Sequence, residues 1–294
     1  MKRLALAALF LVAGCGTLGV QAHTISLAYK AGDTYKYTLH AVLKYTIGAA
    51  GISIPFNLDM SAKETVKVKS VDSSATADLS IDLTDLSVKT TTNGVTNTTT
   101  TTTSTTVEVK VAKDGRVISV NGSALGSGTL PGLSGSEGGI VSAILPDNAV
   151  KPGDTWTKNY DQANVAGTTG SIHVTTDNKY LRDEQVNSVN AAVVESKINA
   201  NLDLKLDLSS LGHGATLFPS TGSASGLQSL AIKGTTSTDV TSWIDASAHR
   251  IVKSHSSGTL DATMTMNMTS GSTTPGLTGP FTFKGTQTLD MNPA

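Results

Sequence analysis

The sequence has little charge of either sign, few aromatic residues and one cysteine. Its 294 residues carry 22 Lys and Arg against 23 Asp and Glu, a net charge of -1 at pH 7. This balance gives no support for a nucleic-acid partner, because such proteins usually present a basic face or stripe. One cysteine excludes an internal disulfide framework, a Cys-based zinc cluster and a CxxC redox site. Thirteen Phe, Trp and Tyr are too few to fill a core and also cover a sugar-binding surface.

Catalytic and metal-binding motifs are also missing. There is no GxSxG or SxxK motif, and no glycine-rich loop joins a strand to a helix as phosphate binding requires. The six histidines form no HExxH or other short metal spacing. The carboxylate pairs Asp82/Asp85 and Asp203/Asp207 fall on strand faces whose pattern indicates solvent exposure. We therefore expect a protein that is not an enzyme and that holds no cofactor or metal.

The one long apolar run lies near the N-terminus. Lys2 and Arg3 precede Leu4–Gly14, eleven residues that are too few for a membrane span of about 20 but typical of a signal peptide. Leu11–Cys15 resembles the lipobox of bacterial lipoproteins. The resemblance implies cleavage after residue 14 and an acylated Cys15 (a palmitate-type anchor) as the mature N-terminus.

The residues that follow Cys15 bear on where in the cell envelope the protein is expected to lie. Residue 16 is Gly rather than the Asp of the family's inner-membrane retention signal, so the resemblance implies the outer membrane where the host has one. The alternative is ordinary secretion after cleavage at Val20-Gln21-Ala22. Losing Lys2 and Arg3 leaves 20 basic and 23 acidic residues, so acyl chains rather than charge would hold the protein to a membrane. We expect residues 15–23 to be a lipidated tether.

Alternating apolar and polar residues predict long antiparallel strands. Tyr35 to Ile47 alternates throughout, as do further segments bounded by Asp, Ser, Asn or Gly turns. Lys113-Asp114-Gly115-Arg116 has the composition of a hairpin turn. Thr90–Thr106, with 12 threonines, is predicted to extend the following strand as a Thr-rich edge, or else to be a low-complexity segment. A short helix is expected over Gly138–Leu145, and loops over residues 121–139, 209–228 and 269–280.

Three sequence echoes suggest an internal duplication. Lys30-Ala31-Gly32-Asp33-Thr34-Tyr35 returns as Lys151-Pro152-Gly153-Asp154-Thr155-Trp156, and two looser echoes follow in the same order. The predicted organisation is a first β repeat over residues 24–145 and a second over 146–294, packed as one unit. The predicted fold class is all-β, with duplicated, curved antiparallel sheets forming a half-barrel or a sandwich and at most one short helix.

One apolar strand face is the candidate ligand-binding site. Leu260, Met264, Met266 and Met268 share a parity with Ala262. Closely spaced thioethers suit Cu(I), but no His-x-His or Cys lies near them. Because Met fills irregular apolar space, we expect these side chains to line a core or an apolar pocket.

Ser242-Trp243-Ile244-Asp245, a turn and Arg250-Ile251-Val252-Lys253 resemble a strand pair of envelope lipoproteins, and are similar to the LolA/LppX-like group. That resemblance implies a curved half-barrel around lipid. The family lays helices across the concave face, whereas this chain offers only Gly138–Leu145, so no binding residues are carried over. Two functions stay open: an anchored carrier of a lipid or other apolar ligand, and a structural or partner-binding envelope module with a solid core. A carrier would leave an apolar cavity of several hundred Å³.

Overall fold

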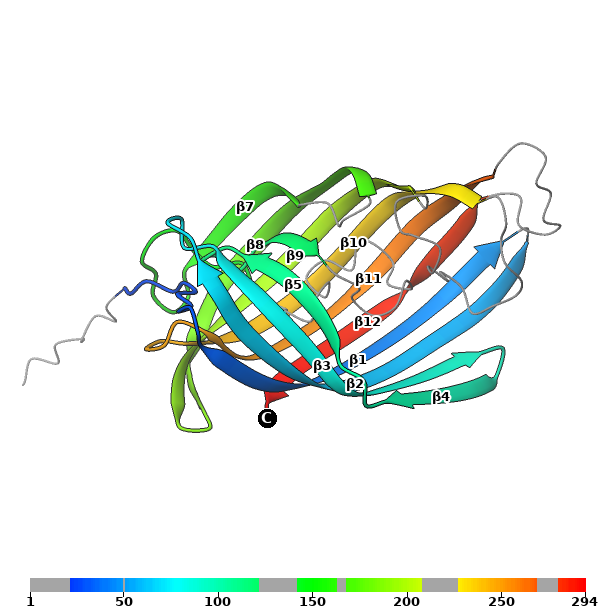
Figure 1. Cartoon of the computed structure of the whole chain (residues 1–294). Coiled ribbons are helices and arrows are strands. Elements are labelled where there is room, and N and C mark those ends of the chain that lie inside the picture. Colours follow the sequence, from blue (N-terminus) through cyan, green and yellow to red (C-terminus); the bar gives the residue numbers. More distant parts are fainter. Residues whose placement is uncertain (1–21, 50, 122–141, 163–167, 208–226, 269–279) are drawn as a thin grey trace, which may run out of the picture.

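The computed structural model describes residues 22–49, 51–121, 142–162, 168–207, 227–268 and 280–294 (Figure 1). The expected signal peptide, Cys15 and most of the three expected loops lie outside these ranges.

The described chain forms one curved antiparallel sheet of twelve strands that does not close into a barrel (Figure 1). Its order is β6-β5-β3-β2-β1-β12-β11-β10-β9-β8-β7, with β4 paired to β3. The all-β prediction is confirmed, as a single curved sheet rather than two stacked ones. The strands are β1 (Thr34–Ala49), β2 (Ile52–Val71), β3 (Ala77–Thr92), β4 (Val95–Thr101), β5 (Thr105–Val111), β6 (Val117–Asn121), β7 (Thr155–Gln162), β8 (Thr168–Val186), β9 (Val189–Asp207), β10 (Leu227–Asp245), β11 (Ile251–Met268) and β12 (Phe281–Pro293).

The alternation in the sequence decides which side chains face inward. In β1, Tyr37, Leu39, Ala41 and Tyr45 are buried on the concave face. The residues between them lie on the other side because successive side chains of a strand point to opposite faces. The inward residues of the other long strands join them in one core.

The Thr-rich segment forms strands, but not the single extension that was predicted. Thr90–Thr92 end β3, Asn93 and Gly94 make the turn, and β4 runs back along β3 from Val95. Both turn residues have positive φ, 50° and 79°, the backbone that two-residue hairpins of the Asn-Gly type require. The Asn-Gly pair therefore breaks the segment into a hairpin before β5 begins at Thr105.

The helix expected over Gly138–Leu145 is wrong for its described part, because residues 142–145 are not helical. Their backbone groups bond to side chains and turns of the sheet instead of to each other. Residues 138–141 lie outside the described ranges.

One end of the curved sheet is closed, and we call it the base. The turns after β2, β5, β8 and β10 lie there, as does the C-terminus. The N-terminal segment crosses it: the Leu27 N–H donates to the Lys113 carbonyl, and the Ala28 N–H donates to the His249 carbonyl. The opposite end, the rim, carries the β1–β2 and β3–β4 turns and the strand ends beside residues 163–167, 208–226 and 269–279.

His23, the last residue of the expected tether, is bonded to the base of the sheet. Its backbone pairs with Val150 in both directions, at 2.9 and 3.0 Å. Its ring packs edge-on against Tyr180 at the base, with Nε2 3.1 Å from the Tyr180 hydroxyl. These contacts hold His23 against the base.

The two echoed turns share one geometry. Gly32 and Gly153 both have φ above 90°, and each donates its N–H to a carbonyl of the second strand after its turn, Val68 on β2 and Tyr180 on β8. Each neighbouring Asp, at 33 and 154, donates its N–H to the lysine carbonyl three residues earlier. Strands β1 to β6 form one half of the sheet and β7 to β12 the other. The duplication itself stays a prediction.

Candidate functional site: the concave face

The concave face is divided into bands that run across the strands. Around the middle of β8 to β12 the inward residues are mainly polar and buried: Thr176, Asn178, Ser196, Thr238, Ser242, Ser254, Ser256 and Gln287. Nearer the rim they are apolar and buried: Ile172, Val174, Leu202, Leu204, Ile232, Leu260, Ala262, Met264, Phe281 and Phe283. Register pairing places them side by side, as with Met264 opposite Ile232 and Phe281.

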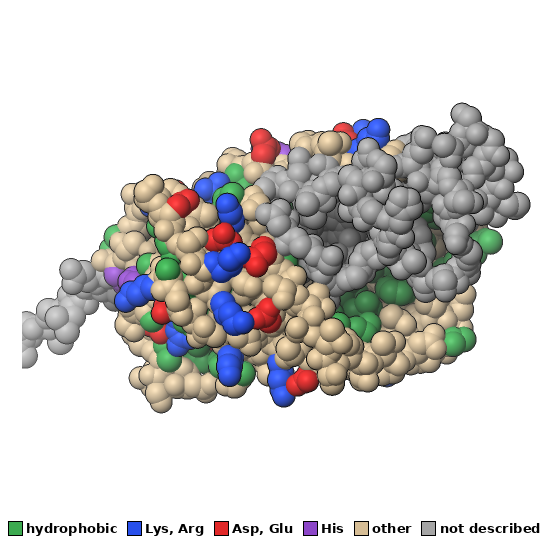
Figure 2. All heavy atoms as spheres, viewed as in Figure 1, with side chains coloured by type: hydrophobic (Ala, Val, Ile, Leu, Met, Phe, Trp, Pro, Cys, Tyr) green, Lys and Arg blue, Asp and Glu red, His purple; other side chains and the backbone are tan. Residues whose placement is uncertain are grey.

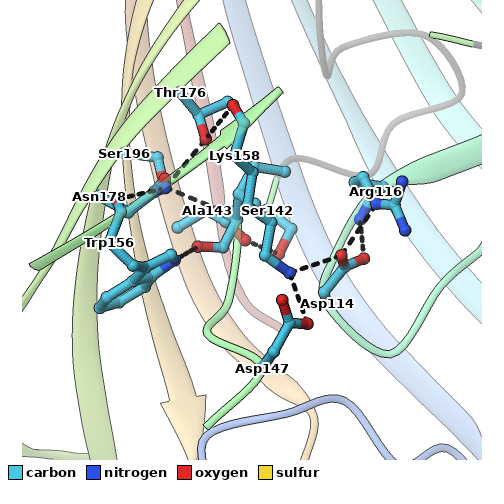
Figure 3. Close-up of polar contacts among 11 residues, drawn as sticks. Asp114, Arg116, Ser142, Ala143, Asp147, Trp156, Lys158, Thr176, Asn178 and Ser196 are labelled. Carbon is cyan, nitrogen blue, oxygen red and sulfur yellow. Dashed lines mark hydrogen bonds and ion pairs between the residues drawn. The ribbon is translucent and has the colours of Figure 1, made fainter. Parts of the chain in front are cut away.

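The polar band holds the segment that connects the two halves of the sheet (Figure 3). The Ala143 N–H donates to Ser242 Oγ and the Ile144 N–H donates to Ser196 Oγ, both at 2.8 Å. Trp156 Nε1 donates to the Ile144 carbonyl at 3.0 Å. Because Ala143 and Ile144 are buried, these side chains satisfy donors that have no water to bond.

Substituting Ser242→Ala is expected to lower the free energy of unfolding by about 1–3 kcal/mol, because the buried Ala143 N–H loses its acceptor. The substitution Ser53→Ala, at an exposed position of β2, serves as the matched control and should have little effect. Urea unfolding of both variants measures the difference. Equal midpoints for the two would contradict this role for Ser242.

Three of the four predicted lining residues have side chains that the structure describes. Leu260 and Met264 are buried on the concave face of β11, and Met266 is half-buried against the same core. They continue the apolar band from the middle of the strand to the rim. The side chain of Met268 lies outside the described set, and so does Cys15.

On β1 and β2, in the half of the sheet formed by β1 to β6, the inner face becomes more exposed toward the rim. Leu43 and Ile47 on β1, and Phe56 and Leu58 on β2, share the inward parity but are only half-buried. Figure 2 shows hydrophobic side chains in a recess at this end of the molecule. Apolar surface of this kind at an opening is a common mark of a binding site.

Two hollows are lined by described residues. One of about 500 Å³ lies over β9 to β12 and is lined largely by outward polar side chains such as Asn201, Thr235 and Asp261. A second, of about 10 Å³, lies near the base between Tyr29, Tyr37 and Ile251. The first is polar and the second has room for about one water. Neither is the apolar cavity of several hundred Å³ that a carrier would leave.

Glu64 is the feature of this face that sequence reasoning missed. It is 1% exposed, and neither carboxylate oxygen has a hydrogen-bond partner. It lies on β2 opposite Tyr37 and Leu83. Burial raises its pKa to about 8, so the group is largely protonated at neutral pH. The parity of Val66 and Val68 already placed Glu64 on the inner face, which was the signal available in the sequence.

The two edges of the sheet are joined near the base by a partly buried ion-pair cluster, which we call the edge clasp (Figure 3). Asp114, in the β5–β6 turn, accepts hydrogen bonds from Lys158 on β7 and from Arg116, both at 2.8 Å. Lys158 also pairs with Asp147 at 2.9 Å. Burial alone would raise the pKa of Asp114, but the hydrogen bond and charge of Lys158, with Arg116, hold it below its usual value.

The described residues contain no group of three or more His, Cys, Asp or Glu side chains placed to hold a metal ion. Across the same ranges, no helix has the length and apolar character needed to cross a bilayer.

Comparison with known proteins adds little. No family model matches the chain, and no curated protein matches it. Among solved structures it is similar to DynF from the dynemicin biosynthesis pathway of Micromonospora chersina, at 7% identity and a TM-score of 0.24 over 94% of this chain and 90% of that one. At that TM-score the likeness carries no argument for a shared fold or function.

Proposed function

We propose that this protein is an extracytoplasmic lipoprotein, anchored through acyl chains on Cys15, that binds a lipid or other apolar ligand against the rim half of its concave face. The observation that carries the proposal is the apolar band itself. It runs from Leu260 and Met264 on β11 across to Ile172 on β8, and it meets half-buried apolar side chains at the rim.

The chemistry of the band favours an apolar ligand. On β8 to β12 the inward side chains of this band carry no Asp, Glu, Lys or Arg, so an ionic group would find no partner there. The base is closed by Ile25, Leu27 and the segment 142–145. We therefore place the entrance at the rim, where the described inward side chains of β1 and β2 are half-buried. Pockets for small apolar molecules are concave and lined mainly by such side chains.

A polar substitution at the entrance is expected to weaken ligand binding. Ile47→Asn puts an amide among the half-buried inward residues, whereas Thr46→Asn puts the same group on the outer face one residue away. Titration with diphenylhexatriene, an uncharged apolar fluorophore, should show an affinity loss of about tenfold for the first variant. The second should bind as the unsubstituted protein does.

Equal affinities for the two variants would contradict binding at the rim. If the unsubstituted protein failed to bind the probe at all, the result would favour a structural or partner-binding module with a solid core. The intact mass of the purified protein tests the anchor independently, because acylation of Cys15 adds the mass of its acyl chains.

A further inference from the structure

The rim ends in two apolar hairpin tips. Ile52 in the β1–β2 tip is 65% exposed, and Val95 in the β3–β4 tip is 63% exposed. A third exposed aliphatic residue, Ile118 at 38%, lies on β6 next to the turn at the base. The tips are near each other, because β2 and β4 both pair with β3. Large aliphatic side chains held in water at two adjacent tips indicate a surface that docks on something apolar.

Both tips are free of charge. Residues 46–58 and 90–106 contain no Asp, Glu, Lys or Arg. In Figure 2 the visible charged side chains gather mostly over the base and the middle of the molecule, away from these tips. A protein partner is usually selected by complementary charges, whereas entry into a lipid interface is penalised by charged groups. Uncharged aliphatic tips, of which the Val95 tip is flanked by threonines, therefore suit a bilayer better than a charged protein surface.

The anchor leaves from the opposite end. His23, Leu27 and Ala28 are fixed across the base by backbone hydrogen bonds. The seven peptide steps from Cys15 to Ala22 can span at most about 25 Å. The 16 residues of β1 run about 50 Å from base to rim. Acyl chains on Cys15 therefore cannot lie beside the hairpin tips while the chain from residue 23 stays in place.

We propose that the Ile52 and Val95 tips dock on a lipid bilayer other than the one that holds Cys15, so that the rim opens toward a facing membrane. The inference rests on the proposed function, since it takes the acylated anchor and the rim entrance from it. It adds what the rim contacts: the uncharged aliphatic side chains of the two tips enter the interface of an opposed bilayer.

The test uses the full acylated protein in donor vesicles, mixed with fluorescent acceptor vesicles of phosphatidylcholine. Co-sedimentation of acceptor with donor measures docking. The unsubstituted protein is expected to capture the acceptor vesicles. The double variant Ile52→Asp/Val95→Asp is expected to capture at least about fivefold less. Ile118→Asp is the matched control and should capture as the unsubstituted protein does. Because the tips carry no charge, capture should change little between about 50 and 500 mM salt.

Several results would overturn the inference. One is that the unsubstituted protein captures no acceptor vesicles. Another is that Ile118→Asp loses as much capture as the double variant. A third is that only acceptor vesicles containing envelope proteins are captured. Thermal unfolding of each variant checks the fold, and the milder pair Ile52→Ser/Val95→Ser should show an intermediate loss. Diphenylhexatriene binding, measured on the same preparations, keeps the two proposals apart. Retained probe binding without capture contradicts the docking alone, whereas missing probe binding or a missing acyl mass contradicts the proposed function.

Discussion

Replacing Glu64 by methionine is expected to stabilise the fold, by an amount that grows as the pH rises from about 5 to about 8. The carboxyl group is enclosed among apolar neighbours and has no hydrogen-bond partner. Below the ordinary pKa of 4.5 it is protonated in both the folded and the unfolded chain, so it adds no pH dependence there. Methionine is close in size and removes the unpaired oxygens.

The sign of the pH dependence follows from the raised pKa. Folding lifts the pKa of Glu64 from 4.5 to about 8, so the folded chain keeps a proton that the unfolded chain releases. Stability is therefore lost as the pH rises between these two values. The full loss is about 5 kcal/mol, since each pKa unit corresponds to about 1.4 kcal/mol. Above pH 8 the folded protein must bury a carboxylate with no partner.

Urea unfolding at several pH values measures this effect. The unsubstituted protein should lose stability from pH 5 to pH 8, and Glu64→Met should lose much less. Glu64→Gln should flatten the curve in the same window, because it removes the ionisation but keeps the shape. Glu195→Gln, on the exposed face of β9, should run parallel to the unsubstituted protein. Parallel curves for all variants would contradict the buried, unpaired state of Glu64.

Substituting Asp114→Ala is expected to lower the free energy of unfolding by about 3–5 kcal/mol. Asp114 is the shared acceptor of the edge clasp, and its loss leaves Arg116 and the largely buried Lys158 short of a counter-charge. Lys158 keeps Asp147, which limits the loss. The clasp joins the β5–β6 turn to β7, so its removal should also free the two edges of the sheet near the base.

Hydrogen exchange and chemical unfolding together test the clasp. Backbone amides of β6 and β7 should exchange faster in Asp114→Ala than those of the central strands β1 and β12. The control is Asp203→Ala, which breaks an exposed pair with Lys233 and should cost less than about 1 kcal/mol. Because the pKa of Asp114 is held below its usual value, its contribution is present at neutral pH and is lost in acid. An equal cost for the two substitutions would contradict the clasp.

Much of the fold could be predicted from periodicity, because alternation is a local signal. The inward set of β1 was fixed by Tyr35 to Ile47 alone, and the apolar set on β11 by Leu260 to Met266. Local turn chemistry also located the Asp114 turn. The same kind of signal was overlooked at Asn93-Gly94, where the threonine run concealed a standard hairpin turn.

The rest depends on contacts between residues far apart in sequence. Residues 142–145 have an apolar composition that favours helix, but their backbone is held by Ser196 and Ser242 from distant strands. The pairing of Asp114 with Lys158, 44 residues apart, is likewise set by how far the sheet curls. Glu64 was placed on the inner face by parity, but its lack of a partner depends on every strand around it.

The most direct test of the proposed function is native mass spectrometry of the protein produced from its full sequence and purified under mild conditions. The account predicts a mass that exceeds the chain and its acyl chains by one apolar molecule, which organic extraction removes. Ile47→Asn should reduce the occupied fraction, and Thr46→Asn should not. A mass equal to the acylated chain alone, unchanged after incubation with envelope lipids, would contradict ligand binding on the concave face.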